Sequence, residues 1–366
     1  MTTRTQPSVR EVGVDDAVRL AREGYTILDV REKAEWDDGH IAGARHVPLG
    51  ELAQRAGEVL PDLDTPILVH CLSGARSARA AGWLAQAGYG DVVNLRAHLG
   101  EWRARGGPWE EPPPVLSEEQ RRRYARQILI PELGMEGQRR LLDAKVLLIG
   151  AGGLGSPAAM YLAASGVGTI GLVDDDVVEL SNLQRQILHT TDRIGVPKTE
   201  SARQSINALN PDTNVVQHGE RLSDENVERL IEPYDIVVDG TDNFDTRYVL
   251  NDAAVKLRKP VVHGSIYRWD GHVTTFVPFE GPCYRCMHPT QPPPELAPAC
   301  SVAGVLGVLP GIVGLLQANE VFKLALGVGE PLVGRLLMFD AMGTRFDEVR
   351  VWRDPGCPAC GEGAQL

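Results

Sequence analysis

Short apolar runs recur along the chain, and stretches with helical spacing separate them. In the N-terminal part these runs cover 26–30, 67–70 and 91–95. Short runs of β-branched and aliphatic residues, bounded by polar or glycine-rich segments, predict buried strands. Because helical stretches alternate with these strands, the pattern predicts a small α/β domain.

The longer C-terminal part repeats this alternation. Apolar runs at 145–149, 169–174 and 234–239 are separated by helical segments. That order predicts a doubly wound parallel sheet. The longest apolar run, 302–316, contains glycines and one proline. It is shorter than the ~20 residues of a membrane span, so we expect a buried helix.

The segment 105–115 breaks the periodicity between the two parts. It contains a run of three prolines beside two acidic residues, a composition typical of an exposed, semi-rigid linker. Ser117 and Gln120 then have the spacing of a capping box, which predicts a charged helix over 118–128. The predicted organisation is a small domain, a linker and a larger domain: 1–107, 108–116 and 117–366.

Composition narrows the class of protein. The 366 residues are 43% hydrophobic and 23% charged, as in an ordinary globular protein. The net charge of −12 argues against a nucleic-acid partner. The N-terminal residues MTTRTQPSVREVGVDD lack the apolar segment that a signal peptide contains. We therefore expect neither a signal peptide here nor a membrane partner. Six cysteines in a chain of this length fit a reduced, cytoplasmic location better than a disulfide scaffold.

The stretch HCLSGARS, 70–77, places a cysteine between a predicted strand and an alanine-rich helix. The backbone N–H groups of such a loop point inward, and the helix N-terminus adds partial positive charge. Cys71 should therefore have a lowered pKa and act as a nucleophilic thiolate, with the charge of Arg76 nearby. The simpler alternative is a buried structural cysteine.

Motifs around this loop resemble the rhodanese domain, a sulfurtransferase fold, over about 12–109. The resemblance implies that Cys71 carries a persulfide. Rhodanese-like phosphatases are an alternative, but they hold five residues between cysteine and arginine, whereas this chain holds four. The smaller loop suits a sulfur atom. The motifs are Leu28-Asp-Val-Arg-Glu32, Glu35-Trp36, Gly39-His-Ile-Ala-Gly-Ala44 and Val47-Pro-Leu49.

A second glycine-rich loop, Gly150-Ala-Gly-Gly-Leu-Gly155, has the spacing of a phosphate-binding loop. This fingerprint also occurs in NAD-dependent oxidoreductases, and Asp174 would suit a ribose hydroxyl in either class. Arg185 and Lys198 favour a polyphosphate that loses pyrophosphate over a hydride carrier. Asp242 should lie at the carboxyl edge of the sheet, where a carboxylate can hold Mg²⁺.

Together these motifs resemble the molybdopterin-synthase adenylyltransferases over about 116–361. This MoeB/ThiF group is related to the ubiquitin-activating enzymes. The resemblance implies ATP-dependent adenylylation of a small ubiquitin-like sulfur-carrier protein at its Gly-Gly C-terminus. Molybdenum cofactor, thiamine, tRNA thiolation and siderophore pathways all use such enzymes. The motifs are Tyr124-Ala-Arg-Gln127, the glycine loop, Asp174, Ser181-Asn-Leu-Gln-Arg185, Pro197-Lys198 and Thr241-Asp-Asn243.

The resemblance also implies residue roles. Arg126 would enter the active site of a second subunit, which implies a homodimer. Asp242 with Asn243 would serve Mg²⁺ and catalysis. Asp174 would meet the ribose of ATP. The remaining ATP contacts would come from Gly153, Ser181, Asn182, Leu183, Gln184, Arg185 and Lys198.

Four cysteines form two C-x-x-C pairs about seventy residues apart. Cys283, Cys286, Cys357 and Cys360 would supply four thiolates for a structural Zn²⁺, and the family resemblance implies the same site. Two redox pairs or two disulfides are the alternative. The resemblance places Cys300 where some relatives bond covalently to the carrier, the alternative being a small, partly buried thiol.

The two loops together predict a coupled reaction. Adenylylation activates the carrier carboxylate as an anhydride with AMP. The Cys71 persulfide, loaded by a donor such as a cysteine desulfurase, would displace AMP and lead to a thiocarboxylate. Tethering the two domains raises the effective concentration of the sulfur donor. An adenylyltransferase whose rhodanese domain only docks a partner is the alternative.

Overall fold

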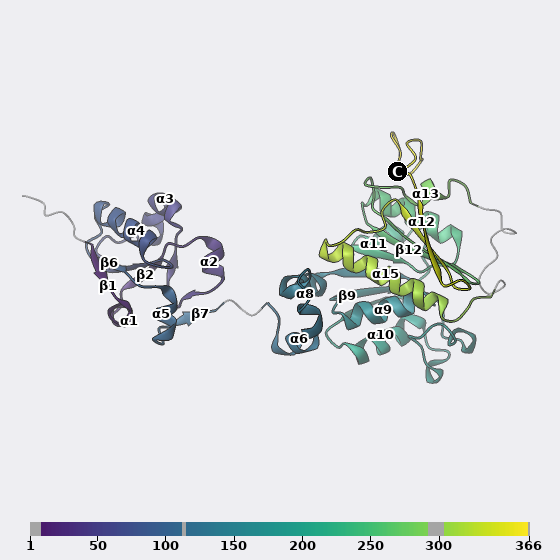
Figure 1. The fold of residues 1–366 in the computed structure, drawn as a ribbon, viewed down its shortest axis with the longest axis horizontal. Coiled ribbons are helices and arrows are strands. Elements are labelled where there is room, and N and C mark those ends of the chain that lie inside the picture. The colour runs from purple at the N-terminus through teal and green to yellow at the C-terminus, as the bar shows by residue number, and fades with distance from the viewer. Residues whose placement is uncertain (1–8, 112–114, 292–303, 365–366) are drawn as a thin grey trace, which may run out of the picture. The chain divides into compact units, whose positions relative to one another are not determined.

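The computed structural model describes residues 9–111, 115–291 and 304–364. The chain divides into two compact units, Met1–Pro114 and Val115–Leu366 (Figure 1). Each unit has its own hydrophobic core, and each is described separately below.

Unit 1 contains a five-stranded parallel sheet in the order β1-β6-β5-β2-β4. Ile67 and Val69 of β5 pack in one core with α3 and α4, and Leu68 packs in the other with α1 and α5. Because helices cover both faces of this sheet, β5 is apolar at every position except its last, His70. The strands are β1 (Arg10–Val12), β2 (Thr26–Asp29), β4 (Arg45–His46), β5 (Ile67–His70) and β6 (Val92–Leu95). The helices are α1 (Val14–Arg22), α2 (Lys33–Asp37), η1 (Leu49–Glu51), α3 (Leu52–Val59), α4 (Ala75–Gln86) and α5 (Leu99–Ala104).

Part of the segment expected to be linker belongs to unit 1. Strand β7 (Trp109–Glu110) pairs antiparallel with β3 (His40–Ile41). The Trp109 ring also packs against the core that contains Trp102. The linker expectation is therefore wrong for Trp109 and Glu110, because a local strand pairing outweighs the turn-forming composition around them.

Unit 2 contains an eight-stranded sheet in the order β10-β9-β8-β11-β12-β13-β14-β15. The pairs from β10 to β12 are parallel, as a doubly wound fold requires, and those from β12 to β15 are antiparallel. The first strands are β8 (Lys145–Ile149), β9 (Thr169–Val173), β10 (Asn214–His218) and β11 (Ile236–Asp239). The others are β12 (Val261–Tyr267), β13 (Asp270–Phe276), β14 (Arg335–Asp340) and β15 (Arg345–Arg350).

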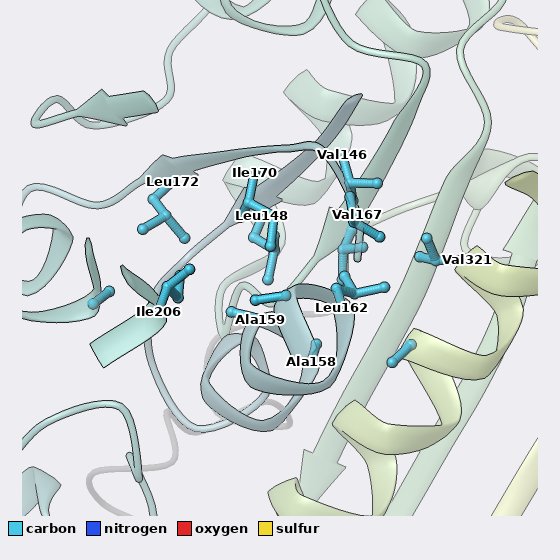
Figure 2. Close-up of a cluster of buried hydrophobic side chains, with 14 of the residues drawn as sticks. Val146, Leu148, Ala158, Ala159, Leu162, Val167, Ile170, Leu172, Ile206 and Val321 are labelled. Carbon is cyan, nitrogen blue, oxygen red and sulfur yellow. The ribbon is translucent and has the colours of Figure 1, made fainter. Parts of the chain in front are cut away.

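Helices cover both faces of the parallel part. Leu148 and Ile170 share one core with Ala159 and Leu162 of α9, and Val321 of α15 lies beside them (Figure 2). Alternate strand positions pack in a second core with α11 and α12. The helices are α9 (Gly155–Ala164), α10 (Lys198–Leu209), α11 (Val227–Ile231), α12 (Phe244–Lys256), α13 (Tyr284–Met287) and α15 (Leu309–Leu326). Short 3₁₀ turns are η2 (Leu180–Asn182) and η3 (Thr191–Arg193).

Two helix predictions need correction. The capping box at Ser117 is confirmed, but 118–128 forms two helices, α6 (Glu118–Arg123) and α7 (Ala125–Ile128), before α8 (Gly134–Asp143). Tyr124 interrupts them because it is buried and its hydroxyl accepts a hydrogen bond from Asn210 at 2.9 Å. The helix expected at 302–316 begins only at Leu309, with Pro310 in its first turn, and continues to Leu326. Among the described residues, no helix is long and apolar enough to cross a membrane.

Candidate functional site

A crevice opens at the carboxyl ends of β8 and β11. The two strands are neighbours, but the chain runs to opposite sides of the sheet after them, which is where ligands bind in this fold class. A Cβ atom on Gly150 would lie 3.2 Å from the carbonyl oxygen of Gly240, and one on Gly155 would lie 2.0 Å from that of Gly150. Only glycine fits at Gly155, so α9 can begin directly at the crevice and direct its N-terminus toward a phosphate.

This crevice continues into a cavity of about 540 Å³. A larger open hollow lies near Ile236 and Pro260, at the opposite edge of the sheet, and contains none of the predicted site residues. The cavity at the crevice contains five of them: Gly153, Asp174, Arg185, Lys198 and Asp242. The structure therefore brings together residues from five separate segments.

Asp174 and Lys198 face each other in the cavity. Asp174 follows β9, and its carboxylate accepts hydrogen bonds from the backbone N–H groups of Ala151, at 2.8 Å, and Asp176, at 3.0 Å. The Lys198 ammonium lies 2.7 Å from an Asp176 oxygen and 3.9 Å from an Asp174 oxygen. Burial raises the pKa of Asp174. These contacts hold the Asp174 carboxylate and the Lys198 ammonium at the carboxyl edge of the sheet, beside the glycine loop.

The segment 181–185 contributes to the cavity through Arg185. The Arg185 guanidinium donates to the Ser181 carbonyl oxygen at 3.1 Å, and the Asn182 side chain caps the turn by accepting from Glu179 N–H at 3.1 Å. Ser181, Asn182, Leu183 and Gln184 do not line the cavity, so the structure gives them a supporting position.

Asp242 and Asn243 have different surroundings. Asp242 lines the cavity and is exposed. The Asn243 side chain accepts a hydrogen bond from Thr246 N–H at 2.9 Å and so caps α12. Arg126 lies on α7 with an exposed side chain and does not line the cavity of its own chain.

Sequence reasoning missed several residues around the cavity. His189 is buried, and its ring bridges the Ala151 carbonyl oxygen, at 2.9 Å, and the Ser201 hydroxyl, at 3.0 Å, which fixes the glycine loop to α10. Arg247 and His263 also line the cavity. His263 lies in an apolar strand, and Arg247 is one of many helical arginines, so neither stands out in the sequence.

In unit 1, the Cys71 loop has the geometry expected of an activated thiol. Gly74 has φ of +92° and donates its N–H to the Cys71 sulfur at 3.2 Å, and the Ser77 hydroxyl lies 3.5 Å from the same atom. Burial alone would raise the pKa of the thiol. Hydrogen bonds from the Ser77 hydroxyl and from the backbone of Ser77, Ser73 and Gly74 outweigh it, so the pKa is lowered. The expected direction is therefore confirmed.

Arg76 has a partner that the sequence did not indicate. Its guanidinium binds both oxygens of Glu35, at 2.6 and 2.7 Å. Hydrogen bonding to Arg76 lowers the pKa of Glu35 to about 2. Arg76 is thus paired mainly with Glu35, although it also interacts with the Cys71 sulfur. Hydrogen bonds from Ser77 and the loop amides are the main causes that lower the pKa of Cys71.

Four cysteines meet at the end of unit 2. The sulfur atoms of Cys283, Cys286, Cys357 and Cys360 all lie within 4.8 Å of one another. The Cys283 sulfur lies 3.9 Å from that of Cys286 and 3.6 Å from that of Cys357, and the sulfur atoms of Cys286 and Cys360 are 3.4 Å apart. Tetrahedral zinc with Zn–S bonds of ~2.3 Å would place them about 3.8 Å apart. All four are free thiols, and the cluster is compatible with Zn²⁺. Cys300 lies outside the described residues.

We predict that this cluster stabilises unit 2 through bound zinc. Cys286→Ser and Cys357→Ser should each reduce the zinc content of about one ion per chain. A loss of ~2 kcal/mol would lower the melting temperature of unit 2 by about 4–8 °C. Elemental analysis and calorimetry would measure the two effects. Cys71→Ser, in the other unit, is the matched control and should retain zinc; zinc-free wild-type protein with unchanged melting would contradict the prediction.

A glycine loop, a buried acid and a lysine at the ends of parallel strands define a nucleotide-binding α/β enzyme, joined here to a second unit with an activated thiol. The chain belongs to the ThiF family, whose family model matches residues 124–359, and a rhodanese-like domain model matches 15–105.

Curated relatives align with about two thirds of the chain. The SAMP-activating enzyme E1 of Haloferax volcanii is 53% identical over 66% of this chain and 89% of its own. The sulfur carrier protein adenylyltransferase of Thermus thermophilus is 51% identical over 66% and 90%. The probable adenylyltransferase/sulfurtransferase MoeZ of Mycobacterium tuberculosis is 48% identical over 70% of this chain and 66% of its own.

The fold also resembles a solved structure. Escherichia coli MccB has a TM-score of 0.60 and 23% identity, and the alignment covers 69% of this chain and 77% of that one. This likeness supports the fold of unit 2.

Proposed function

We propose that this protein uses ATP to adenylylate the C-terminal glycine of a small ubiquitin-like sulfur-carrier protein. A persulfide on Cys71 then supplies sulfur for the carrier thiocarboxylate. One observation carries the proposal: the same chain combines the nucleotide crevice of Asp174, Arg185 and Lys198 with an activated thiol loop. The names of two aligned relatives agree with it: one is a sulfur carrier protein adenylyltransferase, and the other pairs adenylyltransferase with sulfurtransferase.

The first step forms an acyl adenylate. A carrier carboxylate oxygen attacks the α-phosphorus of ATP, the bond from that phosphorus to the bridging oxygen breaks, and pyrophosphate leaves with the electron pair. The glycine-loop amides would bind phosphate, and Asp174 would accept hydrogen bonds from ribose hydroxyls. Arg185 and Lys198 would stabilise the charge that develops on the phosphates. Mg²⁺, held by Asp242, would neutralise the same charge.

Lys198 must exchange partners when ATP binds. Its ammonium donates to an Asp176 oxygen at 2.7 Å. Because its side chain is only 8% exposed, the ammonium lies in a region of low dielectric, where a phosphate would compete strongly for it. Asp176 would then keep Lys198 positioned until the nucleotide arrives.

The second step transfers sulfur. The terminal sulfur of the Cys71 persulfide attacks the acyl carbon, the bond from that carbon to the phosphate oxygen breaks, and AMP leaves. An acyl disulfide joins the carrier to Cys71. A second thiol then attacks the Cys71 sulfur, which releases the carrier thiocarboxylate and leaves a disulfide at Cys71, so electrons balance. Cys300 stays a candidate for covalent chemistry. A cysteine desulfurase is the proposed class of persulfide donor.

The test is an assay with ATP, pyrophosphate and a Gly-Gly-terminated carrier identified by co-purification. Exchange of pyrophosphate into ATP should depend on the carrier. With a persulfide donor present, the carrier mass should increase by one sulfur-for-oxygen exchange. Carrier-independent turnover, or a nicotinamide absorbance change, would contradict the proposed function.

We further propose that the active form is a homodimer in which Arg126 acts in the partner's site. Leu129 and Ile130, just after α7, are 72% and 48% exposed, as expected of side chains that a second subunit covers. Mixing Arg126→Ala with Asp242→Ala, each inactive alone, should therefore restore activity through one hybrid site. Random exchange at equal amounts should give about a quarter of wild-type exchange activity. Demonstrated subunit exchange without recovery would contradict a shared site.

A further inference from the structure

The cavity has a second half, over β11 to β13, that the nucleotide contacts above leave unused. Its polar lining includes Arg247, His263, Ser265 and His272. We infer that Arg247 binds the carboxylate that is to be adenylylated. This inference rests on the proposed function and deepens it, because it assigns a substrate-binding residue to the same site.

Arg247 has hydrogen-bonding capacity that the protein does not use. Its side chain, on α12, is only 10% exposed. One guanidinium nitrogen donates to the Thr241 carbonyl oxygen at 2.7 Å, whereas the buried Nε has no hydrogen-bond partner among the described residues. The Phe244 ring lies 5.5 Å from the guanidinium carbon and limits its movement. A buried guanidinium with unused donors at a cavity wall indicates an anionic ligand.

Asp239, the carboxylate nearest to Arg247 among the described residues, already accepts hydrogen bonds from other groups. It accepts hydrogen bonds from His263 Nδ1 at 2.7 Å, Thr241 N–H at 3.0 Å and the Thr241 hydroxyl at 2.7 Å. Its separation of 3.9 Å from Arg247 Nε is too long for a hydrogen bond. Asp239 thus lies close enough to stabilise the arginine charge but does not use the guanidinium as a hydrogen-bond donor.

The surroundings favour a carboxylate over a second phosphate. Burial lowers the pKa of His263 and of His272, so both rings are neutral near pH 7. Among the described residues of this half, Arg247 alone has a permanent positive charge. A single planar guanidinium matches a carboxylate bidentately. Thr241 and Asp242 lie between the two halves, so a carboxylate on Arg247 would approach the nucleotide from the side opposite the glycine loop.

The experiment compares two synthetic peptides that end in Gly-Gly, one a free acid and one a C-terminal amide. The acid is assayed as substrate in ATP–pyrophosphate exchange, and the amide as a competitive inhibitor of that reaction. In wild-type protein the acid should bind at least about tenfold more tightly, because a charged hydrogen bond is worth roughly 1.5–3 kcal/mol. Arg247→Gln should reduce the ratio of the acid affinity to the amide affinity to about one, and Arg247→Lys should retain part of this preference for the acid.

Controls separate this role from a structural one. A variant that merely disturbs the Thr241 loop would weaken acid and amide equally and leave their ratio unchanged, which would overturn the inference. ATP affinity should stay near wild type in Arg247→Gln and Arg247→Lys. Arg345→Ala, an exposed arginine on β15, should keep the wild-type ratio. No exchange by wild-type protein with either the peptide or the intact carrier would instead refute the proposed function.

Discussion

Asp242→Ala should reduce carrier-dependent ATP–pyrophosphate exchange by about 10²–10³-fold, the usual effect of removing one electrostatic contact to a transition state. The Asp242 carboxylate faces the cavity and makes no hydrogen bond or ion pair within the described part of the chain. It is therefore free to hold Mg²⁺ against the phosphates. The rate of label exchange from pyrophosphate into ATP measures the effect.

The lack of partners for the Asp242 carboxylate among the described residues also allows an effect on catalysis to be separated from an effect on stability. Because no side chain in the described ranges is hydrogen-bonded or ion-paired to Asp242, the substitution should leave the melting temperature unchanged. Asp245→Ala is the matched control: Asp245 lies three positions further on, is exposed, and pairs with Gln291 outside the cavity. It should exchange at the wild-type rate. Wild-type exchange by Asp242→Ala would remove Asp242 from the mechanism.

Cys71→Ala should abolish sulfur transfer from a persulfide donor and leave ATP–pyrophosphate exchange intact. The thiol lies in unit 1, whereas every nucleotide contact proposed above lies in unit 2. Free sulfide at high concentration should bypass the defect, because it can attack the acyl adenylate directly. The measurement is the mass of the carrier: unmodified, adenylylated or thiocarboxylated.

Ser77→Ala provides a graded comparison for Cys71→Ala. The Ser77 hydroxyl helps lower the pKa of the thiol, so its loss should slow sulfur transfer at neutral pH and shift the pH–rate profile upward. Arg76→Ala should have less influence on the thiol, because Arg76 is paired mainly with Glu35. Sulfur transfer by Cys71→Ala at the wild-type rate would mean that unit 1 only docks a partner.

Hydrophobic pattern was enough to find six parallel strands, β2, β5, β6, β8, β9 and β11, because they are largely buried and form continuous apolar runs. It did not find β1, β4 and β10, which are more exposed. It could not find β15, whose residues are exposed throughout and whose sequence, RFDEVR, is mostly polar. Strand β15 exists because β14 offers it a complete antiparallel ladder. The break at Tyr124 likewise depends on Asn210, a contact across 86 positions that no local signal contains.

The site shows the same division. Glycine loops and C-x-x-C pairs are local motifs, so the sequence alone places Gly153 and the cysteine cluster. The pairing of Arg76 with Glu35 spans 41 positions, and the group of Asp239, Arg247 and His263 comes from three elements. Such groups form only when strand register aligns them, as when Asp239 and His263 become partners on β11 and β12.

The four-cysteine cluster affects local unfolding of the C-terminal strand β15. It joins residues 74 positions apart, and the segment it encloses contains α15, β14 and β15. An exposed edge strand at a chain end would ordinarily fray first and exchange its amide hydrogens fastest. Closed by a metal, that end is joined to α13, which Arg285 ties to Asp252 of α12. Removal of the metal would release this end, so the amide hydrogens of β15 should then exchange faster than in the zinc-loaded protein.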